Sequence, residues 1–344
     1  MPRDHRRAWL SFLPPRCPYS ACSAFLHPDP GFFLRWGSYH PLCRPFPVPR
    51  FRCRRCRRTF SRQSFCAHRR LHKPHLTSQV WLDFVSGVSI QQSARRLRVS
   101  RTTVEDRRDR VGRHCLRLLH NLERRTPPPP RAQMDEIETF ERHRVLRPLT
   151  VGLLVDAESH YVMAFAVGRM RSRGSSSPGS RRRREVFEAL HGRRPSESGK
   201  VVRSCLRRLR GGRVQLLTDR KPLYATAVAA LFPGGEVEHV TISGKLPKGP
   251  ANPLFVVNHA AAMARYGMSR LIRRTWCTTK DRRRLRLHGA MWSVWGNCWR
   301  WRSNGERVTP AMARGIVPRR LRMEELFGWR QDWGKRSIPV EAAG

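Results

Sequence analysis

The chain has 344 residues, enough for two or three domains, and it carries 69 Lys and Arg residues against 25 Asp and Glu residues. A net charge of +44 implies a phosphate-rich partner or an anionic membrane. No apolar run approaches the roughly 18–20 residues of a membrane span, and Pro14 and Pro15 interrupt the first apolar stretch. We therefore expect a reducing cytosol, in which the ten cysteines are thiols or metal ligands.

The first segment, residues 1–75, is rich in Cys, Pro, His and Arg. Cys17 and Cys22 lie in CPYSAC, and Cys53 and Cys56 lie in RFRCRRCRRTFS. Thiolate pairs on two short loops form tetrahedral structural zinc sites, so we predict a zinc-ribbon-like region with these four ligands. Two alternatives stay open: no metal, or a two-Cys-two-His finger built from Cys53, Cys56, His68 and His72.

Residues 76–124 have the pattern of a helix-turn-helix domain. A first apolar face ends at Gly87, Ser89 can cap a second helix, and Ser100 can cap a third. We expect Val104 to be buried and four side chains of the third helix to be exposed for major-groove contacts: Arg101, Thr103, Arg107 and Arg108. The alternative is an ordinary three-helix packing unit with a solvated charged face.

Residues 125–132 form a proline linker, and residues 133–300 alternate between strand and helix patterns. The expected strands are 134–140, 149–155, 161–167, 214–217 and 237–242. The expected helices are 222–231, 258–274 and 284–294. We expect the Arg- and Ser-rich residues 171–184 to form a loop and residues 301–344 to form a basic C-terminal tail.

Two aspartates lie on expected strands of this part. Asp135 lies in QMDEIETF, and Asp219 ends the apolar run that begins at Val214. If their strands are neighbours, the two carboxylates can converge on magnesium or manganese ions, which favour oxygen ligands. A structural cap or a surface position is the alternative for each aspartate.

The order of these motifs resembles a family: insertion-sequence transposases with a zinc ribbon, a helix-turn-helix and an RNase H-like catalytic domain. The resemblance rests on RFRCRRCRRTFS, SIQQSARRLRVSRTTV, MDE at 134–136, TDRKPLY at 218–224 and NHAAAMARYGMSRLIRRTWCTTK at 258–280. It implies a multidomain protein whose catalytic domain is α/β with a mixed sheet.

The resemblance further implies that Asp135 and Asp219 are catalytic and bind Mg²⁺ or Mn²⁺. The family's third acidic position falls on Asn258, so the expected triad is Asp-Asp-Asn instead of the usual Asp-Asp-Glu. An amide oxygen can coordinate a metal, but it adds no negative charge. From their helical spacing, basic residues beyond Asn258 are expected to share a face and hold the DNA backbone: Arg265, Arg270, Arg273, Arg274 and Lys280. The alternative is a solvated basic face.

The expected function is therefore that of a prokaryotic DNA transposase. It would bind the terminal repeats of a mobile element as a homo-oligomer on double-stranded DNA, cut a phosphodiester, and transfer the strand. It would lie in the cytoplasm with the nucleoid, without a membrane partner. A non-catalytic DNA-binding protein, either a regulator or an inactivated transposase remnant, is the rival class, and a basic RNA-binding factor is a third.

Overall fold

A computed structural model describes residues 11–19, 21–41, 46–69, 71–123, 126–171, 177–247, 249–272 and 275–329. The chain divides into two compact units. Unit 1 comprises Met1–Gln79 with Arg322–Glu341, and unit 2 comprises Val80–Leu321 with Ala342–Gly344. Within the described residues, none of the helices combines the length and the apolar character that crossing a membrane requires.

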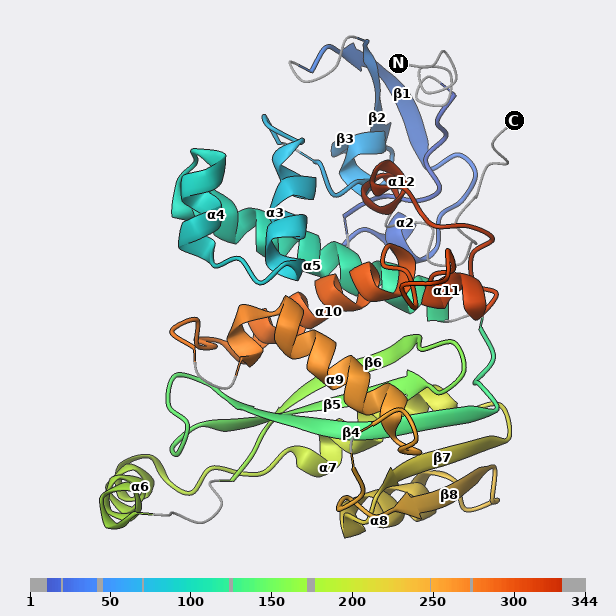
Figure 1. Cartoon of the computed structure of the whole chain (residues 1–344). Coiled ribbons are helices and arrows are strands. Elements are labelled where there is room, and N and C mark those ends of the chain that lie inside the picture. Colours follow the sequence, from blue (N-terminus) through green and yellow to red (C-terminus); the bar gives the residue numbers. More distant parts are fainter. Residues whose placement is uncertain are drawn as a thin grey trace. The chain divides into compact units, whose positions relative to one another are not determined.

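Unit 1 contains an antiparallel three-stranded sheet in the order β1-β2-β3 (Figure 1). Its strands and short helices are β1 (Phe33–Tyr39), β2 (Val48–Cys53), β3 (Thr59–Ser61), α2 (Ser23–Leu26), η1 (Arg62–Phe65) and α12 (Met323–Gly328). Aromatic rings fill the small core, in which Phe51 packs edge-on against Phe12 and Phe33. So little apolar volume favours an additional stabilising centre such as a metal.

Unit 2 is built on a five-stranded mixed sheet in the order β6-β5-β4-β7-β8. Its strands are β4 (Arg131–Phe140), β5 (Pro148–Asp156), β6 (Val162–Arg169), β7 (Val214–Asp219) and β8 (Val237–Ile242). The first three pair antiparallel, whereas β4 with β7 and β7 with β8 pair parallel. This mixed sheet is consistent with the RNase H-like domain that the resemblance implies.

Helices cover both faces of this sheet (Figure 1). One face packs against α9 (Phe255–Gly267) and α10 (Arg282–Cys298), and the other packs against α7 (Ser198–Leu206) and α8 (Pro222–Leu231). Close approach is possible because glycines face α7: a Cβ at Gly152 or Gly168 would lie 2.8 or 2.5 Å from the side chain of Val201. Short helical segments of this unit include η2 (Arg207–Leu209), η3 (Ser269–Leu271) and α11 (Pro310–Ala313).

The expected helix-turn-helix segment forms α3 (Leu76–Val85), α4 (Ile90–Leu97) and α5 (Arg101–Glu123). Ser89 caps α4 in a capping box with Gln92, and Ser100 accepts a hydrogen bond from the Thr103 N–H at the start of α5. The third helix is long, because it continues through an apolar stripe that packs against α10. A Cβ at Gly112 would lie 2.6 Å from the Cβ of Leu287, so the two helices cross closely.

Two expectations for local structure were wrong. The predicted loop at 171–184 contains the start of a helix, α6 (Pro178–His191), which Ser177 caps. The predicted helix at 258–274 begins earlier, at Phe255, and α9 ends at Gly267. Composition misled both predictions, since serine and glycine near the arginine run suppressed the helix signal and the apolar spacing continued past the real end.

Candidate functional site

Asp135 and Asp219 lie at the same level on adjacent parallel strands. The β4–β7 pairs Arg131–Gln215, Ala132–Leu216 and Gln133–Leu217 share an offset of 84 residues, which is also the offset between Asp135 and Asp219. The ladder ends at Gln133 and Leu217, so both aspartates lie two residues beyond its last pair.

Both aspartates belong to the face of the sheet that α9 covers. Ile137 on β4 and Leu217 on β7 pack in one core cluster with Val257 and Ala261 of α9. Because side chains alternate along a strand, Asp135 and Asp219 share the face of these two residues. Asn258 lies in the first turns of α9, so it belongs to the helix that covers the same face.

Gln133 fixes the start of α9 to β4. Its side chain is 4% exposed; Nε2 donates to the Pro253 carbonyl oxygen at 2.7 Å, and Oε1 accepts from the Val257 N–H at 2.9 Å. One amide thereby satisfies two backbone groups at a helix N-terminus. Gln133, which lies two residues before Asp135 on β4, thereby sets the position of the turn of α9 that carries Asn258.

Backbone N–H groups orient the two carboxylates. Asp135 Oδ1 accepts from the Glu136 N–H at 2.7 Å, and Asp219 Oδ1 accepts from the Lys221 N–H at 3.1 Å. Burial, and then the charges of Glu136, Asp135 and Asp219, raise the pKa of the Tyr224 hydroxyl far above its ordinary value.

Glu136 anchors the opposite face of β4. Its carboxylate accepts from the Thr150 hydroxyl at 2.7 Å and from the Tyr224 hydroxyl at 3.3 Å, and it forms an ion pair with Lys221. The Glu136 side chain is only 4% exposed, so loss of the Lys221 ammonium would leave a buried, unpaired charge. This cluster holds the turn that follows Asp219.

Sequence reasoning missed Gln133 and the contacts of Glu136 with Thr150, Tyr224 and Lys221. A signal for both was available, because Gln133, Asp135 and Glu136 are polar residues in a strand that is buried on both faces. Buried polar side chains need hydrogen-bond or charged partners, which marks them as structural anchors.

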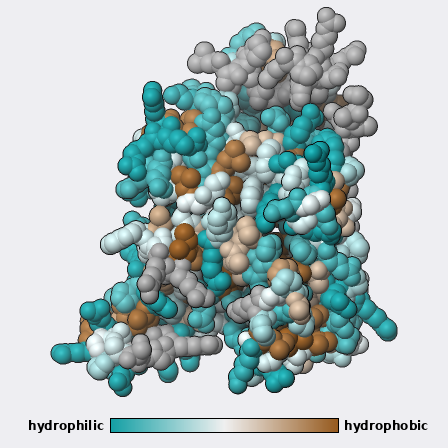
Figure 2. Space-filling view, in the orientation of Figure 1, coloured by the Kyte–Doolittle hydropathy of each residue, from teal (hydrophilic) through white to brown (hydrophobic). Residues whose placement is uncertain are grey.

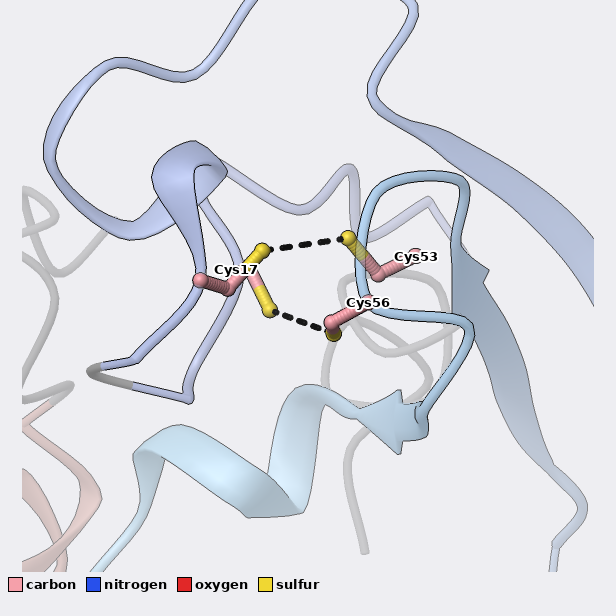
Figure 3. A group of neighbouring side chains, drawn as sticks. Cys17, Cys53 and Cys56 are labelled. Atoms are coloured by element: carbon pink, nitrogen blue, oxygen red, sulfur yellow. Dashed lines mark hydrogen bonds between the residues drawn. The ribbon is translucent and has the colours of Figure 1, made fainter.

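A second candidate centre lies in unit 1, where the four predicted cysteines come together. Their sulfur atoms all lie within 4.8 Å of one another. Cys17 Sγ lies 3.7 Å from Cys56 Sγ (Figure 3). Cys22 Sγ lies 3.7 Å from Cys53 Sγ. Four sulfurs around a zinc ion at about 2.3 Å would be roughly 3.8 Å apart, so the spacing fits this metal.

Backbone N–H groups at this centre oppose the effect of burial on the thiol pKa values. Burial tends to raise the pKa of the Cys53 thiol, but the N–H groups of Cys56 and Arg55 lower it below its ordinary value. Burial raises the pKa of Cys17, and the N–H group of Tyr19 opposes this rise. The alternative finger is not formed: among the described residues, no other group of such ligands gathers, and His68 packs against Phe327.

The predicted DNA-contacting residues differ widely in exposure. Arg101 is exposed and paired with Glu105, Lys280 is exposed, and three residues are half-buried: Thr103, Arg265 and Arg270. Burial, together with the charges of Arg108 and Arg284, lowers the pKa of Arg270 to about 10. Arg273 and Arg274 lie outside the described residues.

The expected exposure was wrong for Arg107 and Arg108. They are 7% and 1% exposed. Arg108 is paired with Asp109, and its guanidinium lies over the Phe84 ring. Three exposed basic side chains lie on and just after α4, where the visible surface is hydrophilic (Figure 2): Arg95, Arg96 and Arg98.

Comparison with protein-family models gave no match, and no curated protein matched the chain. Among solved structures, the chain is similar to the catalytic domain of a mariner transposase. The identity is 14%, the match covers 54% of this chain and 84% of that chain, and the TM-score is 0.24. Values this low assign no function.

Proposed function

We propose that this protein is a DNA transposase with an Asp-Asp-Asn catalytic triad. The observation that carries the proposal is the shared level of Asp135 and Asp219 on adjacent strands, beneath the helix that bears Asn258. The net charge of +44 supplies attraction for DNA.

Asp135, Asp219 and Asn258 would hold Mg²⁺ or Mn²⁺ through their side-chain oxygens, and the oxygen donors fit either ion. When bound, such ions lower the pKa of water and neutralise charge on a reacting phosphodiester. The side chains contribute orientation: N–H groups fix one oxygen of each aspartate, and Gln133 fixes the turn with Asn258. Cleavage at an element end would free a 3′-hydroxyl, which then attacks target DNA.

The four-cysteine centre would bind structural zinc, and the helix-turn-helix would read the terminal repeats. In this proposal the major DNA contacts come from α4 and the first turn of α5, since Arg107 and Arg108 are buried. Two element ends must be joined in one reaction, so the active form would be a homo-oligomer assembled on DNA.

The test is magnesium-dependent cleavage of a plasmid that carries the genomic DNA flanking this gene. Asp219→Ala should abolish cleavage and retain DNA binding, whereas the matched control Glu236→Ala, at an exposed acid outside the site, should cleave normally. Undiminished cleavage by Asp219→Ala would reject the triad. DNA binding by the unmodified chain without any cleavage would favour the rival, a non-catalytic DNA-binding protein in which the uncharged Asn258 no longer supports catalysis.

A further inference from the structure

A groove of about 450 Å³ follows the free edge of the sheet in unit 2. Its floor is β6, which pairs with β5 on one side and has no strand on the other. Residues of α5 and α10 form one wall, and residues of α7 form the other. This groove is separate from the proposed triad, which lies on β4, β7 and α9.

The two ends of this edge are closed by side chains. At one end, the Asn297 amide accepts from the Val162 N–H at 2.8 Å and donates to the Val162 carbonyl oxygen at 3.0 Å. At the other end, the Glu197 carboxylate accepts from the Arg169 N–H at 2.9 Å, and the Glu197 N–H donates to the Arg169 carbonyl oxygen at 2.8 Å. Glu197 thus bonds to Arg169 as a residue of a neighbouring strand would.

The backbone between these ends is open. Both backbone groups of Arg169 point away from β5, and Met170, the next residue, donates to Pro148 at the start of β5. Since this direction alternates along a strand, the N–H and C=O groups of Val167 and Phe165 also point away from β5, into the groove. Within the described part of the chain, no hydrogen bond joins these outward-pointing groups of Phe165 and Val167 to another segment.

The groove walls carry unbalanced positive charge. Its acids are already engaged, because Glu197 pairs with Arg282 and Glu123 pairs with Arg208. Three exposed cations of the lining have no acidic partner in the described part of the chain: Lys200, Arg283 and Arg286.

We propose that this groove binds an extended peptide segment with acidic side chains, which adds a strand to β6. The open N–H and C=O groups two residues apart would pair with a peptide backbone, and the flanking cations would select acidic side chains. A nucleic-acid backbone fits less well, because phosphate oxygens would face the carbonyl oxygens of Phe165 and Val167. The floor is also apolar, with Ala164 and Ala166 beside these residues.

The experiment uses the full chain and a fluorescein-labelled peptide of alternating Glu and Val, as long as the eight residues of β6. The comparison peptide has the same glutamates but Pro in place of each Val, so it keeps the charge and loses the N–H donors. Fluorescence anisotropy should give roughly tenfold tighter binding of the Glu-Val peptide. Equal affinities would overturn the proposal, because charge alone would then explain binding.

Charge-reversal variants locate the site. The double change Arg283→Glu and Arg286→Glu should weaken Glu-Val peptide binding about tenfold, whereas Arg181→Glu with Arg182→Glu, at exposed residues of α6, should weaken it less than about twofold. Equal weakening by both would overturn the proposal. Val167→Pro removes one open N–H without changing charge and should also weaken binding, with the melting temperature as the check on folding.

Duplex DNA is the competing occupant. Unlabelled duplex DNA should not reduce the anisotropy of the bound Glu-Val peptide. The affinity of the protein for duplex DNA should fall equally in the two double variants. Displacement of the peptide by duplex, together with a selective loss of duplex binding in the Arg283 and Arg286 variant, would assign the groove to nucleic acid instead.

Discussion

The side chain of Gln133 and the backbone N–H of Val257 form a buried hydrogen bond of 2.9 Å that joins the central strand to the covering helix. Replacing Gln133 by Leu should leave this N–H and the Pro253 carbonyl unpaired and reduce the free energy of unfolding by about 2–4 kcal/mol. Urea unfolding measures this loss. Gln215→Leu on β7, whose amide pairs with solvent-exposed partners, should cost less than about 1 kcal/mol. A similar cost for both variants would refute the anchoring role of Gln133.

Charge at position 258 should control metal affinity. Asn258→Asp adds a carboxylate beside two others, so the Mg²⁺ concentration for half-maximal cleavage should fall roughly tenfold. A magnesium titration of the cleavage rate measures this. Asn304→Asp, at an exposed position, should leave the titration unchanged. An unchanged midpoint for Asn258→Asp would place this residue outside the metal site.

The four-cysteine centre should hold about one zinc ion per chain. Cys53→Ser removes a ligand whose sulfur lies 3.7 Å from that of Cys22, so zinc content should fall and unit 1 should lose stability. Metal analysis and limited proteolysis measure the two effects. Cys277→Ser, outside the cluster, serves as the control and should retain the full zinc content. Unmetallated, stable wild-type protein would contradict the assignment.

In the proposed helix-turn-helix segment, exposed arginines should affect DNA affinity, whereas buried arginines should affect stability. Arg95 is exposed, so Arg95→Ala should lower DNA affinity and reduce the slope of log affinity against log salt by about one. Arg107 is buried, so Arg107→Ala should change the melting temperature more than the salt slope. Reversed effects would mean that α5 turns its buried side to DNA.

Acid should weaken the contact between α3 and α10. Burial and the nearby Arg270 lower the pKa of His288 to about 3, and its Nε2–H donates to the Phe84 carbonyl oxygen at 2.7 Å. The depressed pKa means that stability is present above the unfolded value of about 6.5 and is lost as pH falls towards 3. The loss is at most about 5 kcal/mol.

Unfolding measured between about pH 7 and pH 4 tests this dependence. His288→Gln, which keeps a donor without a titrating group, should flatten it. His120→Gln, at an exposed position of α5, should leave the wild-type slope. An unaltered slope in the His288 variant would show that another group is responsible.

Local patterns predicted much of the fold. The bounds expected for Val237–Ile242 and Pro222–Leu231 agree with β8 and α8, because short apolar runs and an N-terminal proline mark these elements strongly. The four cysteines also come together as predicted. These signals need no knowledge of distant parts of the chain.

Long-range contacts could not be predicted in this way. Arg107 and Arg108 look exposed in sequence, and only the packing of the folded chain buries them. The anchoring of α9 by Gln133 joins residues 124 positions apart. For the triad, the sequence indicated which residue types to expect, whereas their common level depends on the register of β4 against β7.

The long helix α5 has a mechanical consequence. Its 23 residues span about 34 Å, close to one turn of B-form DNA. The helix runs from the proposed DNA-binding segment at α4 to the part of the core where it packs against α10. Because α5 is continuous and packs against α10, the segment at its start cannot move independently of the core. If the proposed transposase recognises DNA through α4, the rigid α5 would fix the number of base pairs between the recognised sequence and the cleaved bond.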